Sequence, residues 1–276
     1  MVKFEDMINN VILGDCYEVI KNIPDKSVDC IYTDVPYLYI QHGGCKGEIA
    51  KRSAKRELEL LGLEQKKYDD TKGYENLRNA RNRVRYNGNL KGQDLTSGFD
   101  YQEFIKEAFR IMKKCNMFIW CSRMQILNLM NEIHKYCDST IDILVWCKSN
   151  PIPTTNNLWL SDVEYCLYVR DTGTKLNDGY ELKSKWYISP INQSDKDKFK
   201  HPTIKPLNLV ERHILHTTLE NDIVLDCFCG SGTTCVACKN TNRKYIGIEI
   251  NPKWHKVAVD RLNNKEASGQ QTLFTM

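Results

Sequence analysis

The sequence predicts an α/β fold with a mainly parallel sheet covered by helices on both faces. Apolar strand-like runs alternate with amphipathic helix-like segments along most of the chain. The 276 residues suit one large domain or one domain with an insertion, and 41% hydrophobic with 27% charged residues is an ordinary globular composition. Apolar stretches stay far below the roughly 20 residues of a membrane span, and the start has no signal-peptide pattern, so we expect a cytoplasmic protein.

The first 37 residues predict a strand–helix–strand unit. A strand over 11–13 is followed by a Gly-Asp turn, a helix over 16–23 that ends before Pro24-Asp25, and a strand over 28–32. Residues 38–98 then break this pattern, with no sustained period and 13 Lys/Arg against 8 Asp/Glu. We predict a basic insertion there, part helical and part mobile.

The alternation returns at residue 99. Tyr101, Phe104, Ile105 and Ala108 have helical spacing, and the region 99–169 continues with a strand over 116–121, a helix over 125–136 and strands over 141–147 and 163–169. Residues 170–200 are polar, turn-rich and basic, which indicates a second insertion. The region 201–264 predicts a helix over 207–219, a strand over 223–227, a helix over 233–239, a strand over 245–250 and a helix over 252–263, followed by a tail over 265–276.

A glycine-containing loop follows the strand 223–227. Gly230, Ser231 and Gly232 stand between that strand and a helix, where glycine lets a ligand approach backbone amides. Glu249 ends the next strand, 17 residues after Gly232, near the spacing at which an acidic residue binds ribose hydroxyls. No Lys-Ser/Thr pair follows the loop, which argues against a P-loop ATPase. A dinucleotide and S-adenosylmethionine remain as ligands.

The tetrapeptide Asp34-Val35-Pro36-Tyr37 follows the second predicted strand. It combines a carboxylate acceptor, a stiff turn with a free carbonyl, and an aromatic face. Hydrogen bonds from an exocyclic amine to the Asp34 carboxylate and the Pro36 carbonyl would localise the nitrogen lone pair, and Tyr37 would stack on the ring. Asp-x-Pro alone is also common in ordinary turns.

Together these segments resemble the S-adenosylmethionine-dependent amino-methyltransferases of DNA. That family usually has Asp-Pro-Pro-Tyr at the catalytic turn and Asp-Pro-Phe-x-Gly-Ser-Gly-Thr-Thr at the cofactor loop; here they read 34–37 and 226–234. Residues 201–206, and 12–15 with 27–34, resemble two further family segments, and the motif order is that of the β-group. The resemblance implies a Rossmann-like, doubly wound sheet. Val35 and Cys227 stand where the family has proline.

The resemblance also implies roles for individual residues. Asp34, Pro36 and Tyr37 would be catalytic, and no metal is needed because the sulfonium is its own leaving group. Asp15 would approach the adenine end of the cofactor, Lys205 its methionine carboxylate and Glu249 its ribose hydroxyls. The remaining cofactor-binding residues would be Asp226, Phe228, Gly230, Ser231 and Gly232. The alternatives are a helix cap for Asp15 and a solvated lysine at a helix start for Lys205.

A base inside a duplex cannot reach the catalytic turn, so the resemblance implies double-stranded DNA as partner and base flipping. The basic insertion suits phosphate contact, and the residues we assign to it are Lys51, Arg52, Lys55, Arg56, Arg78, Arg81, Arg83 and Arg85. Residues 170–200 stand where the family keeps its target-recognition region. Residues 1–37 with 99–169 would form the catalytic half and 201–264 the cofactor-binding half.

The favoured function is site-specific methylation of adenine N6, as in restriction–modification, in the nucleoid of a bacterial or phage-infected cell. Cytosine N4 is the alternative, although members acting there usually have Ser in place of Asp34. Protein glutamine methyltransferases usually have the cofactor loop first, and an inactive DNA-binding module would have lost groups that are present here.

Three further patterns have separate interpretations. Cys227, Cys229, Cys235 and Cys238 have zinc-like spacing, but they flank the cofactor loop, so we expect reduced thiols and no metal. His213 and His216 are more typical of core and surface histidines than of ligands. The tail string over 270–274, Gln270 to Phe274, resembles the Gln-x-x-Leu-Phe peptides that dock on the bacterial sliding clamp, with packing on this protein or a partner subunit as alternative. The resemblance also leaves a homodimer open.

Overall fold

A computed structural model describes most of the chain, and the chain divides into two compact units. One unit comprises residues 1–35, 100–154 and 159–276, and the other comprises 36–99 and 155–158. Nearly all of the second unit lies outside the described residues, so the following concerns the first. The described residues are 3–36, 99–138, 140–151, 159–172, 183–199 and 203–263, with positions 174, 176, 177, 179 and 201.

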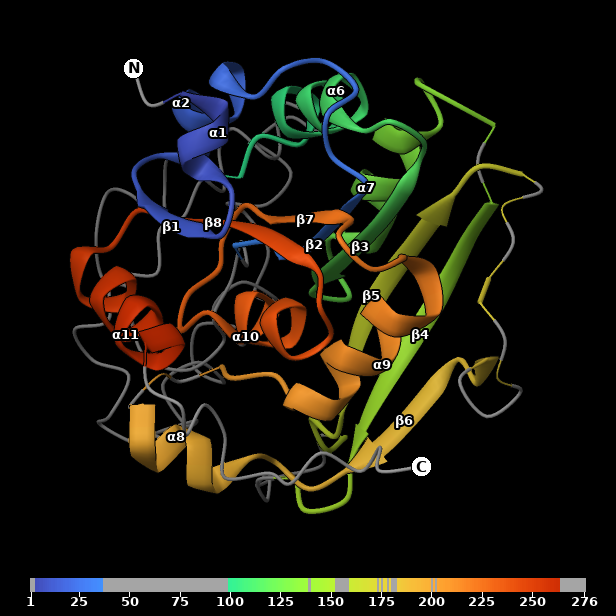
Figure 1. Ribbon diagram of the computed structural model, residues 1–276. Helices are drawn as coiled ribbons and strands as arrows, with labels where there is room; N and C mark the ends of the chain where they lie inside the picture. The colour runs from blue at the N-terminus through green and yellow to red at the C-terminus, as the bar shows by residue number, and fades with distance from the viewer. Residues whose placement is uncertain are drawn as a thin grey trace, which may run out of the picture. The chain divides into compact units, whose positions relative to one another are not determined.

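In the part of the chain that the structure describes, eight strands form one sheet in the order β1-β8-β7-β2-β3-β5-β4-β6 (Figure 1). All of them run in one direction except β5, which is antiparallel to both of its neighbours. The mainly parallel sheet predicted from the sequence is therefore confirmed. The strands are β1 (Asn10–Leu13), β2 (Cys30–Asp34), β3 (Asn116–Cys121), β4 (Thr140–Lys148), β5 (Val163–Arg170), β6 (Trp186–Ser189), β7 (Ile223–Asp226) and β8 (Lys244–Glu249).

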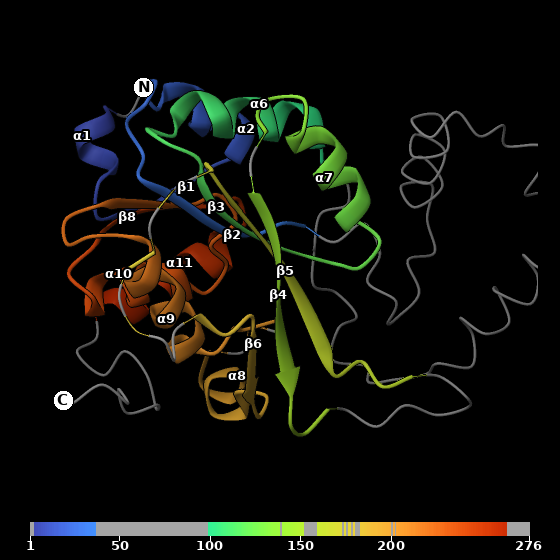
Figure 2. The ribbon, with the colours of Figure 1, turned by 90° about the vertical axis from the view of Figure 1, so that its right-hand side faces the viewer.

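Helices cover both faces of this sheet, as Figure 2 shows most clearly. On one face lie α1 (Phe4–Met7), α2 (Cys16–Val19), the short 3-10 helix η1 (Ile20–Asn22), α6 (Tyr101–Ile111) and α7 (Ile126–Ile133). On the other lie α9 (Leu207–Thr217), α10 (Thr233–Asn240) and α11 (Pro252–Asn263). Asp100 begins α6, because its carboxylate accepts the otherwise unpaired N–H groups of Gln102 and Glu103.

An aromatic cluster joins the central strands to α9. The ring of Phe118 stacks on those of Tyr168 and His213, with centroid distances of 4.3 and 5.0 Å. Trp120 Nε1 donates to the Tyr32 hydroxyl at 2.9 Å, and that hydroxyl lies 3.1 Å from His213 Nδ1. Burial lowers the pKa of His213 to about 3, so this histidine stays neutral. The cluster fixes β2 and β3 against α9.

The sequence predicted a polar insertion over 170–200, and the structure finds a strand and a helix inside it. β6 is the edge strand of the sheet and pairs in parallel with β4, and α8 (Gln193–Phe199) follows it. Strand β6 has only four residues in polar surroundings, which is too short for a clear period of two. Tyr187 packs under the Arg212 guanidinium of α9 at 5.9 Å, whereas Trp186 and Ile188 are exposed.

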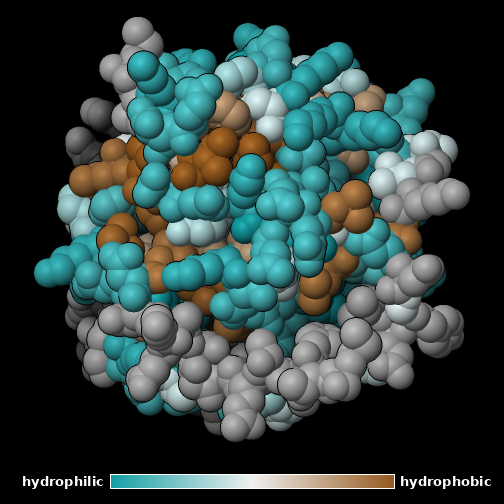
Figure 3. Space-filling model, viewed as in Figure 1, coloured by the Kyte–Doolittle hydropathy of each residue, from teal (hydrophilic) through white to brown (hydrophobic). Residues whose placement is uncertain are grey.

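The face of the described part that is seen in Figure 3 is mainly hydrophilic. Figure 3 shows apolar side chains on the face seen in Figure 1 as separate patches among polar ones. Exposed large apolar residues are ordinary on proteins when they are scattered. Among the helices that the structure describes, none is both long and apolar enough to cross a membrane.

Candidate functional site

Four neighbouring parallel strands end at one edge of the sheet. Because β1, β8, β7 and β2 are adjacent and run in the same direction, they all end at this edge, with β7 ending two residues before its neighbours. Their last residues or the successors of these are the ones that the sequence singled out: Asp15 after β1, Glu249 at the end of β8, Asp226 at the end of β7 and Asp34 at the end of β2. Parallel α/β sheets bind ligands at this edge.

Asp226 connects the end of β2 to the glycine loop. Its Oδ1 accepts from Thr33 Oγ1 at 2.9 Å and from the Phe228 N–H at 3.1 Å, and its Oδ2 accepts from Thr234 Oγ1 at 2.6 Å. Burial raises the pKa of Asp226 to about 6, against the opposite effect of these three donors. The carboxylate thus holds strand, loop and helix α10 together.

The glycine loop has the backbone that the sequence required. Gly230 and Gly232 have φ values of 52° and 77°, in the left-handed region that glycine adopts without strain. A Cβ on Gly230 would lie 2.9 Å from His201 Nε2, and one on Gly232 would lie 3.0 Å from the Ala258 Cβ. The His201 ring rests edge-on against Trp254 at 4.5 Å, and burial lowers its pKa to about 4. The loop therefore packs closely against His201 and Ala258, and the adjacent His201 ring is neutral. We call this close packing the tight cradle of the loop, and it fits a bound cofactor.

Glu249 accepts two backbone hydrogen bonds at the same edge. The Gly230 N–H reaches Oε2 at 2.9 Å and the Asn251 N–H reaches Oε1 at 2.8 Å, while burial raises the pKa of the carboxyl. Each carboxylate oxygen has a second lone pair, so this side chain fits a ribose diol. The Gly14 N–H donates to the Glu249 carbonyl at 3.0 Å, which places Asp15 nearby. Asp15 caps α2 by accepting from the Tyr17 N–H, so the cap interpretation is confirmed, while its role toward adenine stays a prediction.

Lys205 lies beside the predicted catalytic carboxylate. Its Nζ is 2.6 Å from Asp34 Oδ2 and 3.0 Å from Glu164 Oε2, and it stands 5.2 Å from the centre of the Trp120 ring. Lys205 is only 6% exposed, so it is not the solvated lysine of the alternative interpretation. Its predicted contact with the methionine carboxylate stays a prediction.

Sequence reasoning did not single out Glu164. It lies near the start of β5 and accepts from Lys148 at 2.7 Å as well as from Lys205. Burial opposes ionisation of Glu164, but the two ammonium groups outweigh it and lower the pKa to about 2. The available signal was one carboxylate at the start of the apolar run 163–169.

Arg261 of α11 is a second residue that sequence reasoning missed. It is 1% exposed and donates to Thr233 Oγ1 at 2.9 Å and to the Ser231 carbonyl at 3.3 Å. Its Nη2 lies 3.4 Å from the equally buried Asp195 of α8. Arg261 therefore connects the exit of the glycine loop to the region 170–200.

The remaining predicted residues have these outcomes. Phe228 packs against Phe104 with ring centroids 6.0 Å apart. Cys227, Cys229, Cys235 and Cys238 are buried thiols, and no group of three His, Cys, Asp or Glu among the described residues is arranged to hold a metal. His213 and His216 are both buried. Tyr37, the eight basic residues of the insertion and the tail string lie outside the described residues.

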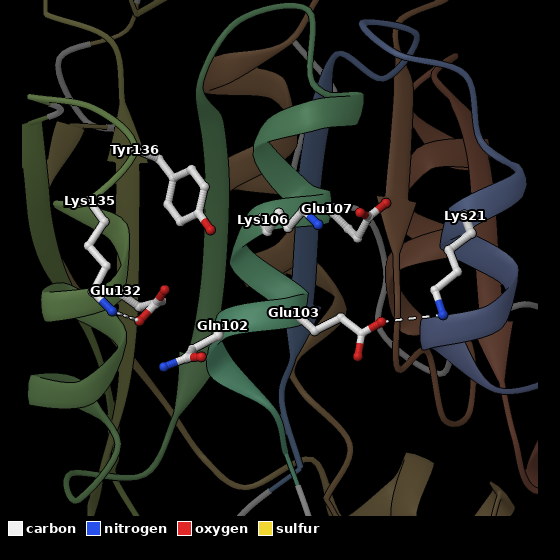
Figure 4. A pocket seen from close by; sticks show the side chains of 8 residues that line it. All are labelled: Lys21, Gln102, Glu103, Lys106, Glu107, Glu132, Lys135 and Tyr136. Atoms are coloured by element: carbon white, nitrogen blue, oxygen red, sulfur yellow. Dashed lines mark hydrogen bonds and ion pairs between the residues drawn. The ribbon is translucent and has the colours of Figure 1, made fainter. Parts of the chain in front are cut away.

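A groove of about 660 Å³ lies elsewhere and is lined by residues of η1, α6 and α7 and by the residues that follow α7 (Figure 4). Its charges compensate one another: Lys21 pairs with Glu103 at 3.3 Å, and Lys135 pairs with Glu132 at 2.7 Å. None of its lining residues is a predicted site residue, so it is separate from the edge described above.

Comparisons with known proteins agree with this geometry. The DNA methylase family model of the N6/N4 type matches residues 28–260. The type II methyltransferase M2.LlaDCHI of Lactococcus lactis subsp. cremoris is 28% identical over 94% of this chain and 92% of its own length. M.HinfI of Haemophilus influenzae, another type II methyltransferase, is 27% identical over 93% and 69%.

Solved structures show the same fold. A crystal structure of the M1.HpyAVI–SAM complex has a TM-score of 0.61 and 25% identity, and the match covers 91% of this chain and 98% of that one. The cytosine-N4-specific PvuII DNA methyltransferase has a TM-score of 0.61 at 14% identity, covering 94% and 87%. At that identity the second likeness concerns the fold alone.

Proposed function

The chain belongs to the N6/N4 family of DNA methylases, and we propose that it transfers a methyl group from S-adenosylmethionine to adenine N6 at a specific site in double-stranded DNA. One observation carries this proposal. Thr33, next to Asp34 at the end of β2, donates to Asp226 at the start of the glycine loop. This bond joins the group that would bind the target amine to the loop that would bind the cofactor.

The residues at the sheet edge fit S-adenosylmethionine. Gly230 and Gly232 let the loop pack closely against His201 and Ala258 in a left-handed conformation, and Glu249 offers acceptors to the ribose hydroxyls. Asp15 lies next to Glu249, where we place the adenine end. When bound, the cofactor supplies a methyl group on a sulfonium that needs no further activation. The protein has to align it with the target nitrogen and exclude water.

Asp34 would act on the amine. Its carboxylate and the Pro36 carbonyl accept hydrogen bonds from the two N–H groups, and Tyr37 stacks on the flipped base. The nitrogen–methyl bond would form as the methyl–sulfur bond breaks, which leaves a neutral thioether, and the methylated amine would release one proton to the Asp34 carboxylate or to solvent. The carboxylate faces the positive charge that develops on nitrogen, which lowers the barrier.

Asp34 favours adenine over cytosine. Family members that methylate cytosine N4 usually have Ser at this position, and this chain has Asp. The glutamine methyltransferase alternative is unsupported, because the family match and the motif order are those of DNA methylases. Analysis of modified nucleosides in DNA from cells that express the protein separates N6-methyladenine from N4-methylcytosine.

DNA contact would come from the basic insertion over 38–98, with target recognition by 170–200; sequence position and charge support both assignments. Homodimerisation, clamp binding through Gln270 to Phe274 and association with the nucleoid in the bacterial cytoplasm are further proposals from the sequence alone. A peptide over 265–276 that fails to bind purified clamp at micromolar concentrations would contradict the clamp proposal.

The substitution Asp34→Ala tests the catalytic role. We expect methyl transfer to fall at least about 100-fold, because an electrostatic contact of the transition state contributes on the order of 3 kcal/mol. Binding of S-adenosylmethionine, measured by calorimetry, should change less than about twofold. Asp25→Ala is the control, since it removes an exposed carboxylate that pairs with Arg110 away from the site. Activity of Asp34→Ala within tenfold of the wild type contradicts the proposal.

A further inference from the structure

Four side chains of alternating charge form a line at the sheet edge. Lys148 Nζ is 2.7 Å from Glu164 Oε1, Glu164 Oε2 is 3.0 Å from Lys205 Nζ, and Lys205 Nζ is 2.6 Å from Asp34 Oδ2. They come from the end of β4, the start of β5, the segment before α9 and the end of β2. Because β5 is antiparallel, its first residues meet the last residues of the other strands.

This line is largely shielded from water. The side chain of Lys205 is 7% exposed, and those of Glu164 and Asp34 are each 24% exposed. Charges act more strongly on one another in such surroundings than in solvent. Glu164 stays ionised because its two lysine neighbours lower its pKa. The ammonium of Lys205 is therefore shared between two carboxylates.

This sharing bears on the chemistry at Asp34. Positive charge develops on the target nitrogen during methyl transfer, and the negative charge of Asp34 stabilises it. An ammonium 2.6 Å from Asp34 opposes that effect. A second carboxylate on the same ammonium offsets it: Asp34, Lys205 and Glu164 together have a net charge of −1, and Lys148, which pairs with Glu164 Oε1, brings the series of four side chains to zero.

We propose that Glu164 is a positioning residue for methyl transfer, which holds Lys205 in place and offsets its charge so that Asp34 acts as an anion toward the target amine. This inference rests on the proposed catalytic role of Asp34. In this proposal Lys205 interacts with the Asp34 carboxylate and not with the cofactor. Strand β5 contributes to the site through Glu164.

The main test is Glu164→Gln, which preserves shape and removes the charge. We expect the single-turnover rate constant at saturating cofactor to fall about tenfold, as is typical when a charge next to a catalytic group is lost. The Kd for S-adenosylmethionine should change less than about twofold. Glu164→Asp keeps the charge and should retain more of the rate than Glu164→Gln.

The control is Glu132→Gln on α7. Glu132 is 6% exposed and pairs with Lys135 at 2.7 Å, so its loss breaks a comparable pair away from the site. Its rate constant should equal that of the wild type. Thermal unfolding of all variants shows whether any rate loss follows a general loss of structure.

Lys148→Met gives an independent test. Lys148 acts on Asp34 only through Glu164 in this proposal, so Lys148→Met combined with Glu164→Gln should be no slower than Glu164→Gln alone. If Glu164 had only a structural role, each variant would have a lower melting temperature, and the rate constants would not show this non-additivity.

Two outcomes overturn the inference. A raised Kd for the cofactor in Glu164→Gln, with an unchanged rate constant at saturation, would assign Lys205 to the cofactor. An unchanged rate constant and Kd, while Asp34→Ala is inactive, would leave the proposed function standing and remove only the role of Glu164. An active Asp34→Ala would instead contradict the proposed function itself.

Discussion

Glu164 and Asp226 are both carboxylates at the edge of the sheet where the site lies, yet their surroundings shift their pKa values in opposite directions. Two ammonium groups lower the pKa of Glu164 to about 2, whereas burial raises that of Asp226 to about 6. Asp226 is surrounded by the hydroxyls of Thr33 and Thr234 and an N–H group, so it organises protein groups. Residue type alone thus does not assign a task to a carboxylate.

The substitution Gly230→Ala tests the cradle. The new Cβ would lie 2.9 Å from His201 Nε2 and would occupy a left-handed backbone position. We expect the affinity for S-adenosylmethionine, measured by calorimetry, to fall at least about tenfold, since the ring is confined by Trp254 and the left-handed conformation alone costs a non-glycine residue about 1 kcal/mol.

His201→Ala separates these two causes. It removes the clash but not the backbone strain, so His201→Ala combined with Gly230→Ala should bind the cofactor better than Gly230→Ala alone and worse than His201→Ala alone. Equal binding by Gly230→Ala and the wild type would contradict the tight cradle.

The sequence singled out some residues of the candidate site and did not single out others, for a physical reason. Asp34, Gly230 and Glu249 stand in short patterns at strand ends, where a local requirement for a turn or an acceptor is visible. Thr33 and Glu164 act on partners far away in the chain, Asp226 and Lys205. Such contacts depend on which strands become neighbours, and residue spacing does not reveal that.

Among the elements, the strands and helices with clear periodicity were predicted within one to three residues. Helix α11 was placed over 252–263, as found, whereas the strand expected over 28–32 begins at Cys30 because Val28 forms an isolated bridge with Met112. β6 was not predicted, because this edge strand pairs with one neighbour only and is just four residues long, which is too short to show the alternation of a strand. The antiparallel direction of β5 also has no local signal.

The pair Arg261–Asp195 connects three elements, and its loss should be costly. Arg261→Met leaves the Asp195 carboxylate buried without its cation, which typically costs about 3–5 kcal/mol of unfolding free energy. Urea unfolding measures this, and cofactor affinity should fall as well because Thr233 and Ser231 lose a donor.

A double substitution checks that the effect comes from the uncompensated charge. Arg261→Met with Asp195→Asn should be more stable than Arg261→Met alone, since the carboxylate is gone. A double variant that is less stable by the full sum of both single losses would argue that the two residues act independently.

At the scale of the whole molecule, the charge is uneven. The chain has a formal net charge of only +4, while the insertion over 38–98 has 13 basic against 8 acidic residues. Replacing Arg81, Arg83 and Arg85 with Gln should weaken binding to every DNA sequence and flatten the salt dependence by up to about three units of slope. Binding titrations at several salt concentrations measure this, with Lys135→Gln in the groove lined by η1, α6 and α7 as control. An unchanged slope would place the phosphate contacts elsewhere.

The strand order also bears on how the protein folds during synthesis. Strand β2 has β3 on one side and β7 on the other, so Cys30 cannot pair with Val224 until β7 has been synthesised. In the same way, Asn10 of β1 cannot pair until Ile246 of β8 has been synthesised. The pair of β2 and β7 can therefore close only after the residues of β7 have left the ribosome. Contacts between such distant segments slow folding through loop-closure entropy and leave strand edges open to aggregation. The same arrangement that brings the two halves of the site together makes the sheet in the nascent chain depend on β7 and β8, which are translated long after β1 and β2.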